Sequence, residues 1–193
     1  IYSIISAILT ECGFTLNALV EDDGIINSLQ PNFEINNQPF EFAAAIIYRL
    51  LSMTKSYLRP KALLQYEVKY PQSADAVNLN YYLDQHQYFY EYTERANVLI
   101  PNHIYAFGNE GADGLWASMI TGEAEDTTES AAYAQAVQLA LAGDITTQGN
   151  INARAAAVLA RARQEALAGR MIAPHDCRLE LYDKIAVYDT RGL

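Results

Sequence analysis

The stretch DITTQGNINARAAAVLARARQEALAG, residues 144–169, decides the fold predicted from this sequence. Its apolar and small side chains recur every three or four positions, which is the spacing of one helix face. This stripe consists of Ile151, Ala155, Val158, Leu159, Ala162, Ala166 and Leu167. Outside the stripe lie Arg154, Arg161 and Arg163. Gly169 stands where a C-cap glycine is expected, so the pattern predicts an amphipathic helix over residues 148–168.

A second helix is predicted earlier in the chain, over residues 39–56. Its apolar positions follow the same three- and four-residue steps, at Ala43, Ile46, Ile47, Leu50, Leu51 and Thr54. Asn37 is a suitable N-cap and Pro39 suits a first helical turn. The Arg59–Pro60 pair should end this helix, because a residue before proline is biased away from helical geometry.

The remaining segments favour strands. Residues 63–70 alternate apolar and polar side chains, and the aromatic residues near 87–94 also favour a strand. Further strands are predicted at 98–107, 116–121, 171–174 and 179–188, and a short helix at 2–12 ends at Gly13. Asp183 falls on the apolar side of its strand, which indicates a tight turn at Tyr182–Asp183. The alanine-rich segment 127–142 is left open as loop, helix or both.

Together these elements predict an α+β fold. Antiparallel strands would form one or two barrel-like tubes, braced by the helices near 39–56 and 148–168. We expect a helix–strand module over residues 1–96 and a barrel-like domain with the long Ala/Arg helix over residues 97–193. The predicted core consists of Ile46, Leu50, Val158, Leu159, Ile185 and Val187.

Composition excludes several classes of protein. The chain has 193 residues, 51% of them hydrophobic, and a formal charge of −10. This apolar content is too high for a disordered chain, and the acidic balance argues against a general nucleic-acid binder. No apolar run reaches the roughly 18 residues that a membrane span needs. Because the chain starts at Ile1, we interpret it as a fragment of a longer polypeptide.

The residues His175, Asp176 and Cys177 are the most reactive-looking triplet, since a histidine beside a thiolate can activate a nucleophile. A turn is the favoured interpretation, with Asp176 bonded to its own backbone and Cys177 buried. Cys12 and Cys177 are expected to be two buried thiols, and a single disulfide is the alternative.

The sequence gives only weak indications of a metal or phosphate site. Potential nitrogen and sulfur ligands are His86, His103, His175 and Cys177, and none of them has the spacing of a known metal motif. Potential oxygen ligands for calcium are Asp113, Glu123, Glu125 and Asp126, which are better explained as a solvated acidic loop. The glycine-rich loop 108–114 lacks the Lys-Ser/Thr of a phosphate loop and favours a hairpin turn. We therefore predict no catalytic residue, no cofactor and no metal.

The second half of the chain resembles bacteriophage tail hub proteins, the baseplate hub or tail-tip proteins of phages and prophages. The matching segments are IPNHI (100–104), GEAED (122–126), ITTQ (145–148), GRMIAPHD (169–176) and LYDKIAVYD (181–189). The helix at 39–56 and the strand at 63–70 also fit the family's earlier portion. One departure is Tyr182, where the family often has glycine before the acid.

This resemblance implies a structural protein without enzymatic activity. Copies would form a ring, commonly a trimer, around a tail channel through which DNA passes without specific binding, and would contact other tail proteins. The expected location is the virion tail, or the host cytoplasm during assembly, and the expected interface runs through the strands at 98–107 and 179–189. The alternative function is a carbohydrate-binding module that uses the tyrosine-rich segment 81–92.

Overall fold

The computed structural model describes residues 1–31, 35, 41–82, 89–92, 100–108, 119–143, 145–166, 169–173 and 176–188. The helices are α1 (Tyr2–Glu11), α2 (Ala43–Ser52), α3 (Thr127–Ala132) and α4 (Gln148–Ala166). The strands are β1 (Thr15–Leu16), β2 (Tyr57–Ala62), β3 (Gln65–Lys69), β4 (Leu79–Tyr82), β5 (Phe89–Tyr92), β6 (His103–Gly108), β7 (Ile120–Glu125), β8 (Val137–Ala142), β9 (Gly169–Ile172) and β10 (Ile185–Tyr188).

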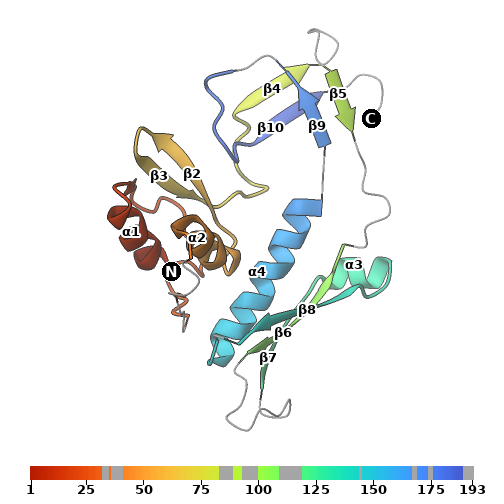
Figure 1. Cartoon of the computed structure of the whole chain (residues 1–193). Coiled ribbons are helices and arrows are strands. Elements are labelled where there is room, and N and C mark those ends of the chain that lie inside the picture. Colours follow the sequence, from red (N-terminus) through yellow and green to blue (C-terminus); the bar gives the residue numbers. More distant parts are fainter. Residues whose placement is uncertain are drawn as a thin grey trace.

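The N-terminal part packs the helix pair α1 and α2 beside a small sheet of order β1-β3-β2 (Figure 1). Its core contains Ile5, Leu9 and Leu50, all buried. Gly13 follows α1 with a φ of +81°, a conformation that glycine adopts without steric cost. The predicted first helix and its C-cap glycine are therefore confirmed.

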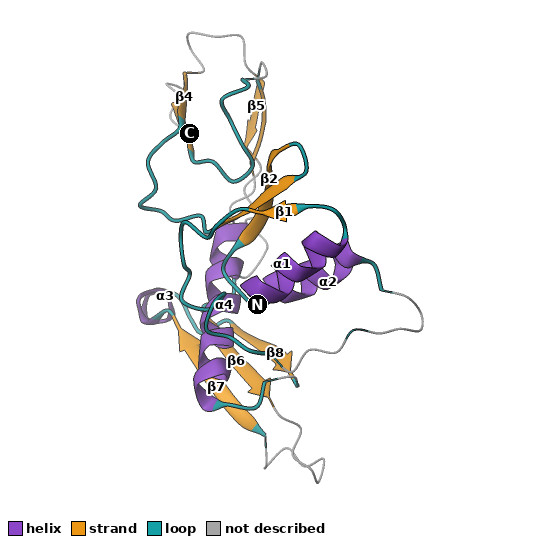
Figure 2. Cartoon of the chain, turned by 90° about the vertical axis from the view of Figure 1, so that its left-hand side faces the viewer, coloured by secondary structure: helices purple, strands orange, loops and turns teal. Residues whose placement is uncertain are grey.

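The long helix α4 covers one face of a second sheet, of order β7-β6-β8 (Figures 1 and 2). Ile104 and Ala106 of β6 and Ala155 of α4 are fully buried where the two layers meet. Gly122 of β7 lets the layers approach closely, because a Cβ there would lie 2.5 Å from the carbonyl oxygen of Ile151. The predicted Ala/Arg helix is confirmed as far as Ala166, and Ile151, Ala155 and Leu159 of its predicted inner face are buried. Leu167 lies outside the described residues, and the predicted C-cap Gly169 is the first residue of β9.

Two small sheets lie beyond the C-terminal end of α4, away from the sheet β7-β6-β8 (Figure 1). One pairs β10 with β4 in parallel, and the other pairs β5 with β9 antiparallel. Each of these sheets joins a strand from residues 1–96 to a strand from residues 97–193. The division of the chain between residues 96 and 97 stays a prediction.

The predicted antiparallel barrel is wrong for the described part of the chain. Its strands form four small sheets, none of them closed, and three strand pairs are parallel. The alanine-rich segment 127–142 explains part of the difference, because it forms α3 and then β8, which runs parallel to β6. A returning parallel strand replaces the antiparallel neighbour that a meander would supply.

The second helix is confirmed over Ala43–Ser52, so it begins later and ends earlier than the predicted 39–56, and its N-cap is Phe42. Asn37 and Pro39, predicted for its start, lie outside the described residues. Pro60 lies within β2, where the pairing with β3 shifts in register between Pro60 and Ala62. A proline donates no backbone hydrogen bond, so it is tolerated at such an irregularity.

The predicted core is confirmed in its helices and wrong in its last strand. Ile46, Leu50 and Leu159 are buried, and Val158 packs half-buried against the same core. Ile185 is 39% exposed and Val187 is only half-buried, because β10 belongs to a two-stranded sheet.

The turn predicted at Tyr182–Asp183 is confirmed, but of the strand predicted over 179–188 only the second half forms, as β10. Tyr182 has a φ of +67°, and the Asp183 carboxylate accepts a hydrogen bond from the backbone N–H of Glu180 at 2.9 Å. Asp183 also pairs with the buried Arg59 of β2 at 2.9 Å, which ties the turn to the N-terminal sheet. Within the described ranges, no helix has the length and apolar character that crossing a membrane requires.

Candidate functional site: an exposed sheet face

The sheet β7-β6-β8 has a second face that α4 does not cover (Figure 2). Side chains alternate between the faces of a strand, so the neighbours of the inward-facing Ile104 and Ala106 point to this outer face. The strand register places on it His103, Tyr105 and Phe107 of β6, Glu125, Glu123 and Thr121 of β7, and Val137, Leu139 and Leu141 of β8. We call these nine residues the outer face.

The β8 side of the outer face is apolar and exposed. Val137 is 51% exposed, Leu139 64% and Leu141 73%. Among the described residues β8 pairs only with β6, so its other side is a strand edge with unpaired backbone groups. Edges of this kind pair readily with other chains, and exposed apolar side chains beside them strengthen that tendency.

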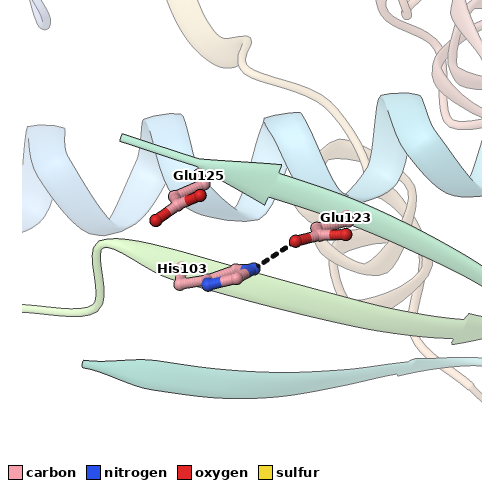
Figure 3. A group of neighbouring side chains, drawn as sticks. All are labelled: His103, Glu123 and Glu125. Atoms are coloured by element: carbon pink, nitrogen blue, oxygen red, sulfur yellow. Dashed lines mark hydrogen bonds and ion pairs between the residues drawn. The ribbon is translucent and has the colours of Figure 1, made fainter. Parts of the chain in front are cut away.

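The β7 side of the outer face is polar and acidic (Figure 3). His103 is buried, with its Nε2 2.7 Å from Oε1 of Glu123, and its ring stacks on Tyr105 with the ring centres 4.4 Å apart. Burial and the charge of Glu123 raise the pKa of the Tyr105 hydroxyl. Hydrogen bonds from Ser130 and Gln135 lower the pKa of Glu125, so this carboxylate keeps its charge.

The expected interface moves with this arrangement. The interface expected along residues 98–107 has no free strand edge in the part that forms β6, because β6 is the central strand between β7 and β8. The edge strands of this sheet are β7 and β8, and β8 carries the exposed apolar side chains. The interface expected at 179–189 stays a prediction.

A separate apolar hollow of about 450 Å³ lies between α1, α2, β2 and α4. Its walls include Ile47, Leu51, Leu58 and Tyr66, and Arg161 of α4 lies at its side. The Arg161 guanidinium lies 4.5 Å from the centre of the Tyr57 ring, in a cation–π arrangement. The residues around this hollow are mainly packing groups.

The predicted reactive residues do not form a site in the described residues. Cys12 and Cys177 are both exposed free thiols, so the expectation of two buried thiols is wrong. Cys12 follows the last turn of α1, at the edge of the apolar hollow, and Cys177 lies in a turn, so both thiols remain exposed. His175 lies outside the described residues. The predicted turn is confirmed, because Asp176 accepts a hydrogen bond from the backbone N–H of Arg178 at 3.0 Å.

The structure brings His103, Glu123 and Glu125 together, a set that the sequence analysis did not combine. Asp126 is directed elsewhere: it caps α3 and pairs with Arg163. His86, His175 and Asp113 lie outside the described residues. A usable signal was the spacing of Glu123 and Glu125, since acids two positions apart on a strand share a face.

The tyrosine-rich segment is described only in part, because residues 83–88 lie outside the described ranges. Tyr81 is buried, and Tyr82 stacks on Tyr188 with ring centres 4.9 Å apart. The stacked pair Tyr82 and Tyr188 lies at one register position of the β4–β10 pairing. Carbohydrate binding by residues 81–92 stays a prediction.

No protein-family model matches the chain, and no curated protein matches it. Among solved structures, the chain is similar in fold to the 43 kDa tail protein of prophage MuSo2 from Shewanella oneidensis, with a TM-score of 0.60 and 12% identity. That match covers 98% of this chain and 57% of the other. A weaker match is the prophage tail protein gp18 from Listeria monocytogenes, with a TM-score of 0.46 and 16% identity over 75% of this chain and 42% of that one. At this identity the first likeness shows a shared fold.

Proposed function

We propose that this chain is a structural subunit of a phage or prophage tail, and specifically of the tail hub or tail tip. The single observation that carries the proposal is the exposed edge strand β8 with its apolar side chains Val137, Leu139 and Leu141. The fold shared with the MuSo2 tail protein over nearly the whole chain supports it. The motifs from 100–104 to 181–189 support the hub assignment.

The outer face suits assembly because a lone copy would expose it to water. Burying the three β8 side chains against a neighbour would be favourable at roughly 25 cal/mol per Å² of apolar surface. The strand edge could at the same time pair its backbone with a neighbouring strand. Both gains are realised when copies close into a ring, which we propose to be a trimer.

A ring of this protein would surround the tail channel and contact other tail proteins. The formal charge of −10 fits a channel that lets DNA pass, since clustered cations would bind phosphates and slow the passage. The proposed role is structural and not enzymatic. The proposed location is the virion tail, or the host cytoplasm during assembly.

Light scattering after size exclusion, at several protein concentrations, tests this proposal. We expect the parent chain to show a mass above that of the monomer, and the double variant Leu139→Lys/Leu141→Lys to be monomeric. The matched control is Leu63→Lys, because Leu63 is 89% exposed and lies outside the outer face. A parent chain that is monomeric at every concentration, or a double variant that assembles like the parent, contradicts the proposal.

A further inference from the structure

His103, Glu123 and Glu125 place one imidazole nitrogen and two carboxylates at one end of the outer face (Figure 3). We propose that these three side chains bind a divalent transition-metal ion of the Zn²⁺ type. The inference is independent of the proposed tail function, because it rests on the donor atoms alone.

The strand register creates this set of ligands. His103 at the start of β6 pairs directly with Glu125 at the end of β7, and Glu123 lies two positions along β7 on the same face. One potential ligand atom from each side chain lies within 4.8 Å of the other two. Ligands of a tetrahedral zinc ion lie about 3.3 Å apart or slightly more, so the 2.7 Å contact between Nε2 of His103 and Oε1 of Glu123 would open by a fraction of an ångström to admit the ion.

The buried state of His103 is a second observation that indicates a ligand. Its side chain is only 3% exposed, and Nδ1 is a buried nitrogen with no hydrogen-bond partner. The other ring nitrogen, Nε2, contacts Glu123, so the described residues give the imidazole no hydrogen bond outside the cluster. Native proteins satisfy most buried polar side chains. Here a buried imidazole contacts the Glu123 carboxylate, and a ligand oxygen of Glu125 lies within 4.8 Å of both.

The exposure of the two acids leaves room for the rest of the coordination shell. Glu123 and Glu125 are both exposed, so water could reach an ion held between them and His103. Three protein ligands with water in the remaining position is a common arrangement for zinc. The ion would also offset the repulsion between two carboxylates on one face.

The donor set favours one class of metal. Calcium and magnesium prefer oxygen ligands alone, whereas an imidazole nitrogen suits zinc, copper, iron and nickel. Zn²⁺ is therefore the probe of choice, and Co²⁺ reports the coordination geometry through its visible absorption.

The experiment measures Zn²⁺ binding to the full chain by competition with a chromophoric chelator. Because Cys12 and Cys177 are exposed thiols that also bind zinc, the background chain carries Cys12→Ser and Cys177→Ser. In that background we compare Glu123→Gln, Glu125→Gln and His103→Gln. The matched control is Glu11→Gln, an exposed acid at the end of α1.

We expect one equivalent of Zn²⁺ to bind to the background chain and to the Glu11→Gln control. Binding should weaken at least tenfold in each of the three cluster variants, with loss of the Co²⁺ absorption bands. If His103→Gln does not fold, the two exposed glutamate variants decide the question. Absent Zn²⁺ binding by the background chain, or glutamate variants that bind as tightly as it does, would overturn the inference.

Discussion

Nη2 of Arg161 donates a hydrogen bond of 2.7 Å to the carbonyl oxygen of Leu51, a residue 110 positions earlier in the chain. The same side chain donates to the carbonyl oxygens of Thr54 at 2.7 Å and Ser56 at 2.8 Å. Arg154 donates likewise to the carbonyl oxygen of Ser52. Helix α4 therefore caps the C-terminal end of α2, where carbonyl groups lack partners within the helix and carry partial negative charge.

Arg161→Ala should destabilise the fold by about 2–4 kcal/mol, because it leaves three backbone carbonyls without their charged donor. Arg161→Lys should fall between the parent and Arg161→Ala, since lysine keeps the charge but loses the planar fork. Urea unfolding followed by circular dichroism measures the difference. The control Arg178→Ala removes an exposed arginine that pairs with Asp176, and should change the stability little, because solvent screens an exposed ion pair. Equal effects of Arg161→Ala and Arg178→Ala would contradict the capping role.

Leu159→Ala should lower the free energy of unfolding by roughly 2–5 kcal/mol, because the Leu159 side chain of α4 is buried in the core. Leu63→Ala is the matched control, since it makes the same change at an exposed site. The same urea titration serves both variants. A loss for Leu159→Ala as small as that for Leu63→Ala would mean that this face of α4 is not buried.

Gly122→Ala should destabilise the protein by about 1–3 kcal/mol or more through overpacking. Its new Cβ would meet backbone atoms of Ile151 and Asn152 at 2.5 to 2.8 Å, and helix backbone near the start of α4, packed against β7, yields little. Gly149→Ala is the control, because it lies in the first turn of α4 with no atom within 4 Å of the added Cβ. That variant should be neutral or more stable, by up to about 1 kcal/mol. Thermal unfolding distinguishes the two, and a stable Gly122→Ala would disprove the close packing of β7 on α4.

Asp75 should contribute to stability at neutral pH and lose that contribution in acid. A hydrogen bond from the backbone N–H of Gln72 and the neighbouring Lys69 lower the pKa of Asp75 below its ordinary value of 3.8. A carboxyl with a lowered folded pKa stabilises the protein above its unfolded pKa, and the effect disappears as the pH falls through the folded pKa.

Asp75→Asn should therefore be less stable than the parent at pH 7, by no more than about 1 kcal/mol for such an accessible ion pair. The gap should close at acid pH, as the pH falls through the lowered folded pKa of Asp75 and the parent carboxyl is protonated. Urea titrations at both pH values measure it. A gap that stays constant with pH would show that the Asp75 charge has no part in stability.

The helices were predictable because their information is local. The stripe from Ile151 to Leu159 marks the buried face of α4, and the misplaced acid Asp183 marked the turn at Tyr182. The role of Arg161 was not predictable, because its partners are backbone carbonyls far away in the sequence. A periodicity analysis treats any arginine off the apolar stripe as a solvated side chain.

Strand β8 and the cluster at His103 could not be predicted from the sequence, because both depend on tertiary contacts. Residues 137–142 consist mostly of alanine and leucine, which favour helices, and it is pairing with β6 that holds them extended. His103 and Glu123 are 20 positions apart, and only the register of β6 against β7 brings them into contact. The same register decides which side of the sheet carries the exposed leucines.

The pairing of β10 with β4 and of β9 with β5 has a consequence for biosynthesis. Strands β4 and β5 leave the ribosome long before their partners are translated, whereas β6, β7, β8 and α4 follow one another closely in the chain. The α4-covered sheet can thus mature on the nascent polypeptide, while β4 and β5 wait unpaired until translation passes Tyr188. A ribosome that stalls before β9 is translated would leave a folded α4-covered sheet and two unpaired strands, β4 and β5. Chaperones and proteases recognise unpaired strands of this kind.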